Sequence, residues 1–223
     1  MRIGVLLSGC GVNDGSEIHE AVLTLLAIDK AGAQAVCMAP DMEQADVVDH
    51  VACKPVQEKR SVLVEAARIA RGNIRSLRDV KPADFDALIL PGGFGAAKNL
   101  STFAKDGQNC SVRPEVADLI SQAHKAGKPI GALCIAPVVL AKVLGAEGPT
   151  LTIGGDPGTA RALEAMGARH EACAADGVVV DNRRRLVTTP AYMLAKRISE
   201  VGSGAEKLVK ALMKLASKPP VSA

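Results

Sequence analysis

The chain has 223 residues, of which 48% are hydrophobic and 23% charged, and its formal net charge is +3. One Tyr, three Phe and no Trp leave few rings for stacking on bases, and so mild a charge also argues against nucleic-acid binding. No run is long and apolar enough to span a membrane. The six cysteines contain no C-x-x-C pair, so we expect reduced thiols in a cytoplasm or an organelle matrix, and of these we predict the cytoplasm.

The first forty residues predict a β-strand, a helix and a second β-strand. Residues 3–7 and 34–38 are the apolar runs, and residues 16–31 form the helix between them. Asp14 and Glu17 have the spacing of a capping box with an acid at each position. Short joints between strand, helix and strand are typical of a parallel sheet, so we predict an α/β fold.

The segment from residue 41 to 81 is polar, and one helix is expected within it. Its apolar positions are Val62, Leu63, Ala66 and Ile69. A basic row formed by Arg68, Arg71 and Arg75 is interpreted as a solvated face, with anion binding as the alternative.

The rest of the chain predicts further alternating strands and helices in one domain over residues 1–216. The expected strands are 85–90, 130–133, 151–153, 178–180 and 185–188, and the expected helices are 112–126, 138–144, 159–166 and 192–216. Residues 217–223 are expected to be a flexible tail.

Cys134 lies where a strand ends and a helix starts. Pro137 suits the first turn of the new helix, since its missing N–H costs nothing there. A thiol in this position faces the positive end of the helix dipole, which favours the thiolate. We therefore predict a nucleophile elbow with sulfur as the nucleophile, and a buried, inert cysteine is the alternative.

Three unusual loops follow strand ends, where ligands bind in open α/β sheets: residues 8–15, residues 91–95 and the turn at Cys134. Backbone N–H groups at Gly92 and Gly93 could hold an oxyanion formed when Cys134 attacks a carbonyl, or the glycines could serve a tight turn only. On the first interpretation, Gly93→Val removes activity and leaves the protein folded.

The first loop also resembles a dinucleotide fingerprint. Gly9 and Gly11 have the required spacing, and Asp41 could bind a ribose. The third glycine is replaced by Asp14, whose charge repels a pyrophosphate, so we do not favour nucleotide binding.

Glu20 is the preferred acid/base candidate because it shares a helical row with Leu23 and Ala27, which predicts that it faces the core. Glu17 lies on a less apolar row and is the second candidate, and both could instead be ordinary first-turn acids. We expect Glu20→Gln to reduce turnover more than Glu17→Gln and to raise the pKa of Cys134.

Five segments resemble the ElbB branch of the ThiJ/PfpI superfamily, the isoprenoid-biosynthesis-associated glyoxalases: VLLSGCGV (5–12), DGSEIHEAVL (14–23), LPGGFGAAKNL (90–100), CIAP (134–137) and VTTPAY (187–192). The resemblance covers about residues 1–216. It implies a flavodoxin-like three-layer sandwich with a mostly parallel sheet, of the class I glutamine amidotransferase-like type. It also implies a nucleophilic Cys134, an acidic Glu20, an oxyanion loop at Gly93 and a homodimer.

The chain lacks the histidine that the superfamily pattern places near the nucleophile. Many members have a histidine directly after the nucleophile, whereas this chain has Ile135, which joins Gly92 and Gly93 as a candidate oxyanion- and substrate-binding residue. Other members supply the histidine from a loop that matches residues 154–156 of this chain, and none is present there. His19, beside Glu20, is therefore an accessory candidate, and Cys10 is a competing thiol at the same end of the sheet.

The resemblance implies glutathione-independent conversion of glyoxal to glycolate through a cysteine hemithioacetal. Such a glyoxalase III-type lyase, with a related deglycase activity, needs no metal or organic cofactor, and its partner is a small dicarbonyl. The alternative is a redox- or metabolite-sensing regulatory protein on the same scaffold. An amidotransferase ranks third because the histidine is missing.

Overall fold

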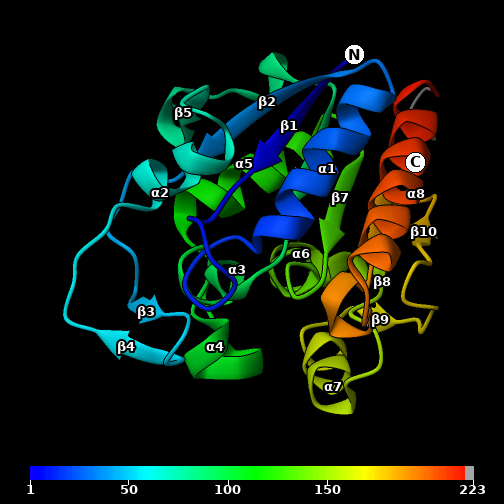
Figure 1. Cartoon of the computed structure of the whole chain (residues 1–223). Coiled ribbons are helices and arrows are strands. Elements are labelled where there is room, and N and C mark those ends of the chain that lie inside the picture. Colours follow the sequence, from blue (N-terminus) through cyan, green and yellow to red (C-terminus); the bar gives the residue numbers. More distant parts are fainter. Residues whose placement is uncertain (219–223) are drawn as a thin grey trace.

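A seven-stranded sheet forms the centre of the computed structural model, which describes residues 1–218 (Figure 1). All neighbouring strands are parallel except the edge pair β10–β11. The spatial order is β10 (Val179–Asp181), β11 (Leu186–Thr189), β7 (Ile130–Leu133), β6 (Ala87–Leu90), β1 (Arg2–Leu6), β2 (Gln34–Ala39) and β5 (Ile74–Ser76). The expected mixed α/β fold with a mostly parallel sheet is therefore confirmed.

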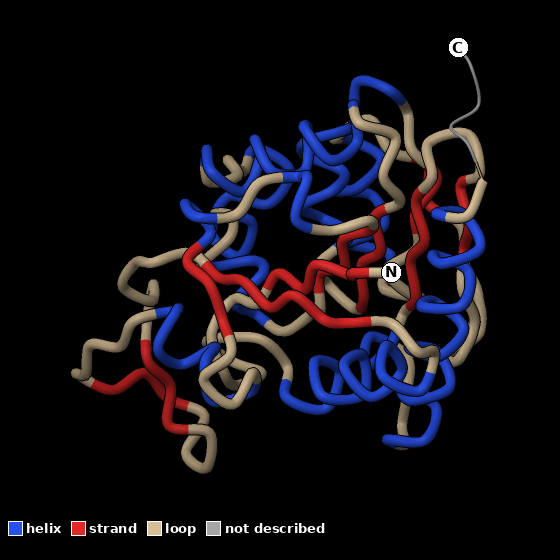
Figure 2. The backbone as a smooth tube through the Cα atoms, turned by 90° about the horizontal axis from the view of Figure 1, so that it is seen from above, coloured by secondary structure: helices blue, strands red, loops and turns tan. Residues whose placement is uncertain are grey.

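Helices cover both faces of this sheet, as the view from above shows (Figure 2). One face packs against α1 (Ile18–Lys30), α2 (Val62–Ile69) and α8 (Ile198–Ala216). The other packs against α3 (Phe94–Lys98), α5 (Pro114–Lys125) and α6 (Pro137–Leu144), and α7 (Pro157–Ala165) packs on α6 and β9 (Arg169–His170) beyond the sheet. Because the central strands β6 and β7 are buried on both faces, their sequences are continuous apolar runs, ALIL and IGAL.

Several short elements lie outside the three layers. The β3 (Val47–Asp49) and β4 (Lys54–Val56) hairpin extends away from the sheet (Figures 1 and 2), and β8 (Thr150–Leu151) pairs with β9 (Arg169–His170). One further helix, α4, spans Phe103–Asp106. Single 3-10 turns occur at Leu77–Asp79, Pro82–Asp84, Gly107–Asn109, Gly145–Glu147 and Ala191–Met193.

The predicted capping box at the start of α1 is wrong. The helix begins at Ile18, and Glu17 itself is the N-cap, its carboxylate accepting the Glu20 N–H at 2.7 Å. The Asp14 carboxylate instead accepts the Val48 N–H at 2.8 Å, so the β3–β4 hairpin has taken this side chain away from the helix.

The last helix was predicted six residues too long at its start. Residues 191–193 form a 3-10 turn in which Ala191 has a positive φ of 44°, and Arg197 is extended. The helix ends at Ala216, as expected, and Ser217 caps it. Residues 219–223 of the expected tail lie outside the described residues.

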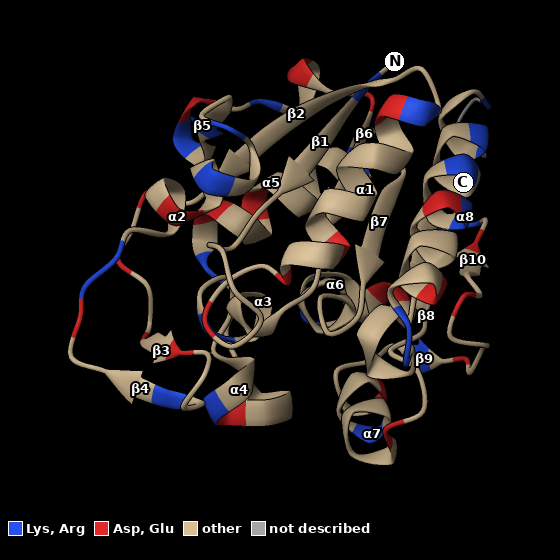
Figure 3. Ribbon diagram, viewed as in Figure 1, with Lys and Arg blue, Asp and Glu red and all other residues tan. Residues whose placement is uncertain are grey.

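The basic row at residues 68–75 is not a continuous face. Arg68 pairs with Glu65 at 2.9 Å, Arg75 pairs with Asp84 at 3.0 Å, and Arg71 lies beyond the end of α2. In the ribbon of Figure 3, positions of Lys and Arg alternate with positions of Asp and Glu along the chain. These pairings favour the solvated surface over the anion site.

Candidate active site

Cys134 follows directly after β7, three residues before α6 begins. Its φ is +57°, an unusual value for a residue with a side chain, and its N–H donates to the Thr189 carbonyl at 3.0 Å. The structure therefore places Cys134 in the strand–turn–helix context of a nucleophile elbow, where such backbone strain is common. The residue is only 8% exposed.

The Glu20 carboxyl group is fully buried and is hydrogen-bonded to the Cys134 thiol. Its two oxygens are also fixed by backbone donors: Oε2 accepts the Gly92 N–H at 3.1 Å, and Oε1 accepts the Tyr192 N–H at 3.1 Å. Three chain segments therefore orient this carboxyl group. We call these two residues the Cys134–Glu20 pair.

Gly92 is packed between the two members of this pair. A Cβ atom at Gly92 would overlap the Cys134 Cβ and approach Glu20 Oε2 to 2.5 Å. The Gly92 N–H is occupied by Glu20, so its predicted part in an oxyanion hole has to be corrected to a part in orienting the acid. The N–H groups of Gly93 and Ile135 hydrogen-bond to the sulfur, and these two donors could hold an oxyanion.

The predicted behaviour of Gly93→Val also has to be corrected. Gly93 has a φ of +96°, and a Cβ atom there would overlap the backbone of residues 15–17. A valine would push the 8–15 loop away, so loss of activity in that variant would not report on the N–H donor alone.

Burial dominates the protonation of the pair. It raises the pKa of Glu20 to about 8, with the charge of Glu17 adding to the effect, although the Tyr192 N–H and the other hydrogen bonds oppose it. Burial, followed by the Glu20 charge, also raises the pKa of Cys134. Glu20 is consequently the first of the two groups to ionise, near pH 8, while the Cys134 thiol keeps its proton there. The expected low-pKa thiolate is wrong, because desolvation outweighs the nearby N–H groups.

The expected effect of Glu20→Gln on the thiol changes sign as well. Both the charge of Glu20 and its hydrogen bond raise the pKa of Cys134. A neutral glutamine removes the charge, so we now expect the substitution to lower the pKa of the thiol.

The accessory candidates have different positions. Glu17 is nearly buried and caps α1, as described above. His19 is exposed, and its Nδ1 lies 2.8 Å from the hydroxyl of Tyr192, so it reaches the site only through that tyrosine. Cys10 lies near the charges of Glu65 and Arg68 and does not line the pocket over Cys134.

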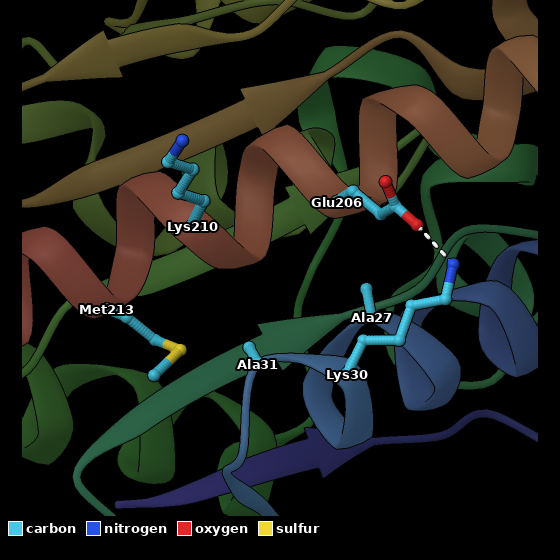
Figure 4. A pocket seen from close by; sticks show the side chains of 6 residues that line it. All are labelled: Ala27, Lys30, Ala31, Glu206, Lys210 and Met213. Carbon is cyan, nitrogen blue, oxygen red and sulfur yellow. Dashed lines mark hydrogen bonds and ion pairs between the residues drawn. The ribbon is translucent and has the colours of Figure 1, made fainter.

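A pocket of about 410 Å³ opens over Cys134. Its walls are mostly apolar and consist of Val12, Gly93, Phe94, Ala97, Phe103, Ala104, Cys134, Ile135, Asp156, Thr159, Tyr192 and Met193. A larger hollow of about 520 Å³ lies between α1 and α8, where Lys30 and Glu206 form an ion pair (Figure 4), but it does not include Cys134 or Glu20. We therefore regard the pocket over Cys134 as the candidate active site.

Sequence reasoning missed the contribution of Tyr192, Phe94, Phe103 and Asp156 to this pocket. Tyr192 belongs to the VTTPAY segment that carried the family resemblance, so its position could have been suspected. Asp156 caps α7 by accepting the Thr159 N–H at 2.6 Å, and it lies in the loop where a histidine was sought.

The loop of residues 8–15, which resembles a dinucleotide fingerprint, uses glycine N–H groups in short-range backbone hydrogen bonds. The Gly11 N–H donates to the Ser16 carbonyl at 2.9 Å, and the Gly15 N–H donates to the Gly11 carbonyl at 2.7 Å. These donors are therefore not available to a phosphate. Within residues 1–218, no cluster of His, Cys, Asp and Glu could hold a metal ion, and no helix could cross a membrane.

The raised pKa of Glu20 predicts a pH dependence of stability. Between about pH 4.5 and about pH 8 the unfolded chain ionises Glu20 while the folded chain keeps its proton, so the free energy of unfolding falls as pH rises. The contribution is at most about 1.4 kcal/mol per pH unit. The free energy of unfolding, measured by denaturant titration at several pH values in this range, should fall less steeply with pH for Glu20→Gln than for wild type. An equal pH dependence in the two proteins would mean that Glu20 is ionised in the folded protein.

The sequence of this chain is similar to one family model and to several vertebrate proteins. A family model described as DJ-1/PfpI family matches residues 10–196. The human protein named glutamine amidotransferase-like class 1 domain-containing protein 3, mitochondrial, is 45% identical over 97% of this chain and 84% of its own length. The zebrafish ES1 protein, mitochondrial, is 33% identical over 97% of this chain and 87% of its own length. These names contradict the cytoplasmic location that we expected.

Solved structures show the same fold. An isoprenoid biosynthesis protein with an amidotransferase-like domain from Ehrlichia chaffeensis is 36% identical, with a TM-score of 0.89 over 96% of this chain and 99% of that one. Glyoxalase III from Candida albicans is 14% identical over 96% of this chain and 97% of that one; its TM-score of 0.62 shows a shared fold only.

Proposed function

This chain belongs to the DJ-1/PfpI family, and on that premise we propose that it is a cofactor-independent glyoxalase that converts glyoxal and related dicarbonyls to hydroxy acids. The observation that supports this is the Cys134–Glu20 pair, held by backbone donors at the base of an apolar pocket. The pair offers a nucleophile and a proton carrier within hydrogen-bonding distance of each other.

In the first step the Cys134 sulfur attacks one aldehyde carbon of glyoxal. A carbon–sulfur bond forms, the carbonyl π bond breaks, and the oxygen takes up the thiol proton to give a hemithioacetal. The negative charge that develops on this oxygen lies near the N–H groups of Gly93 and Ile135, which stabilise it.

In the second step the Glu20 carboxylate moves a proton between the two carbons. It removes the proton from the carbon bonded to sulfur and returns it to the neighbouring carbon, while the hydroxyl proton passes to the second carbonyl oxygen, so that the hemithioacetal becomes a glycolyl thioester. Water then hydrolyses the thioester, which releases glycolate and the free thiol. Glu20 suits this task because its pKa, which burial raises to about 8, lies close to the pH at which turnover is to be measured.

We assign to Tyr192 the role of hydrogen-bond and proton donor to the second carbonyl oxygen of the substrate. Burial and the charges of Glu17 and Glu20 raise the pKa of its hydroxyl, which therefore keeps its proton and can donate it. The hydroxyl lies 2.8 Å from Nδ1 of the exposed His19, so the imidazole can exchange protons between water and Tyr192. This arrangement replaces the histidine that is missing at Ile135.

Placement in the ElbB branch is part of the same proposal. It is supported by the 36% identity with the Ehrlichia chaffeensis isoprenoid biosynthesis protein along nearly the whole chain. A deglycase reaction would use the same thiol on a glycated amine, and the homodimer also stays a prediction.

The test is glycolate formation from glyoxal by protein treated with a chelator to remove metals. Turnover should rise as pH increases through about 8, because ionisation of Glu20 supplies the carboxylate base that moves the proton between the two carbons. Heat-inactivated protein corrects for spontaneous hydration and rearrangement of glyoxal. An absence of glycolate at every pH would overturn the proposal and leave the sensor as the better interpretation.

A further inference from the structure

Three of the four aromatic residues in this chain line the pocket over Cys134. The sequence contains three Phe, one Tyr and no Trp, and Phe94, Phe103 and Tyr192 all lie in the pocket wall. The fourth, Phe85, is fully buried in the core. In a protein so poor in aromatic side chains, this concentration indicates contact with a flat apolar ligand.

The pocket is also larger than glyoxal needs. Its volume of about 410 Å³ falls in the range of roughly 300–1,000 Å³ that holds drug-sized ligands, whereas glyoxal has only a few non-hydrogen atoms. Val12 and Phe94 at its rim are 40% and 48% exposed. Such exposed side chains would be covered by a ligand that extends outward from the thiol.

The charges around the pocket disfavour anions. No Lys or Arg belongs to its lining, and the one charged side chain there is Asp156, which is exposed. Lys98 lies over the Phe94 ring at 5.8 Å, but its ammonium group is paired with the Asp46 carboxylate at 2.8 Å. Arg161 lies near Asp156 but outside the lining. A carboxylate-bearing ligand would therefore meet a like charge and no basic partner within the pocket.

We propose that this site takes uncharged carbonyl compounds with a flat apolar body, such as an aromatic α-ketoaldehyde, in preference to glyoxal and to carboxylate-bearing analogues. The aldehyde reaches Cys134, while the ring lies between Phe94, Phe103 and Tyr192. The part of this inference that concerns turnover rests on the proposed function. The part that concerns pocket selectivity does not.

The experiment uses alkylation of Cys134 as its main readout, with Cys53 as an internal reference. Cys53 is the exposed free thiol in the β3–β4 hairpin loop and lies outside the pocket. Three reagents are compared at pH 8 by peptide mapping: iodoacetamide, 2-bromoacetophenone and 4-(bromoacetyl)benzoate. Since each reagent's intrinsic reactivity cancels in the Cys134/Cys53 rate ratio, that ratio reports selection by the pocket.

We expect this ratio to be at least tenfold higher for 2-bromoacetophenone than for iodoacetamide, and to fall at least threefold when the ring carries a carboxylate. Phe94→Ala should lower the bromoacetophenone ratio, because one ring contact is lost. Asp156→Asn should restore part of the reactivity of the carboxylate reagent, and asparagine caps α7 as well as aspartate does. Val64→Ala, an exposed apolar change on α2, is the matched control and should alter none of the ratios.

Equal ratios for iodoacetamide and 2-bromoacetophenone would overturn the inference, as would a carboxylate reagent that reacts as well as its neutral parent. Turnover of phenylglyoxal and glyoxal is measured alongside, and phenylglyoxal should have the higher kcat/KM. Selective alkylation without turnover of either aldehyde would support the ligand class and reject the glyoxalase.

Discussion

Replacing Cys134 with serine is expected to reduce glyoxal turnover to the background rate. Serine has the same shape and can adopt the same turn, but its hydroxyl is far less acidic than a thiol and cannot form the thioester. The thiol is the only sulfur in the pocket lining other than the thioether of Met193, so no other group there can take over. The measurement is glycolate formation at pH 8, with the thermal midpoint of each variant as a check on folding.

The matched control is Cys53→Ser, which changes a thiol of the same chain that is exposed and outside the pocket. It should keep wild-type turnover. If Cys134→Ser remains active while Cys10→Ser is inactive, the nucleophile lies in the 8–15 loop and the proposed mechanism is wrong.

Glu20→Gln should lower turnover by roughly a hundred- to ten-thousand-fold, the usual worth of a positioned proton-transfer group. Glutamine keeps the size of the side chain but cannot carry the proton between carbons. It also has one acceptor oxygen where Gly92 and Tyr192 present two N–H donors, so a moderate loss of stability should accompany the loss of activity. Turnover at a temperature well below the thermal midpoint separates the two effects.

Glu17→Gln is the matched control, one helical turn away. Its carboxylate caps α1 and contributes to the raised pKa of Glu20 but makes no contact with Cys134 that could transfer a proton. We expect nearly normal maximal turnover, with the pH midpoint shifted downward because a negative charge near Glu20 is lost. Inactivity of Glu17→Gln with activity of Glu20→Gln would show that the acid has been assigned to the wrong residue.

The sequence by itself determined most of the sheet and the place of Cys134. Strands buried on both faces are continuous apolar runs, so β6 and β7 could be recognised without knowledge of their neighbours. Pro137 marked the start of α6 in the same local way. Glu20 was found because a helical row with Leu23 and Ala27 has a fixed geometry, and the side chain is indeed buried.

Only the tertiary structure decided what surrounds these residues. The Glu20 carboxyl group accepts the Tyr192 N–H across 172 residues of sequence, and no local pattern indicates a donor so far away. The same holds for Asp14, which looked like a helix cap and binds a hairpin instead. Backbone donors of this kind carry no residue-specific signal, since every residue except proline has one.

The protonation of Cys134 was predicted wrongly for a related reason. The sequence shows that a helix follows the thiol, and this local feature lowers a pKa. It does not show that Glu20 and the surrounding core exclude water from the sulfur, which raises the pKa by more. Local chain geometry follows from neighbouring residues, whereas desolvation depends on every segment that packs around a group, and those segments meet only in the folded molecule.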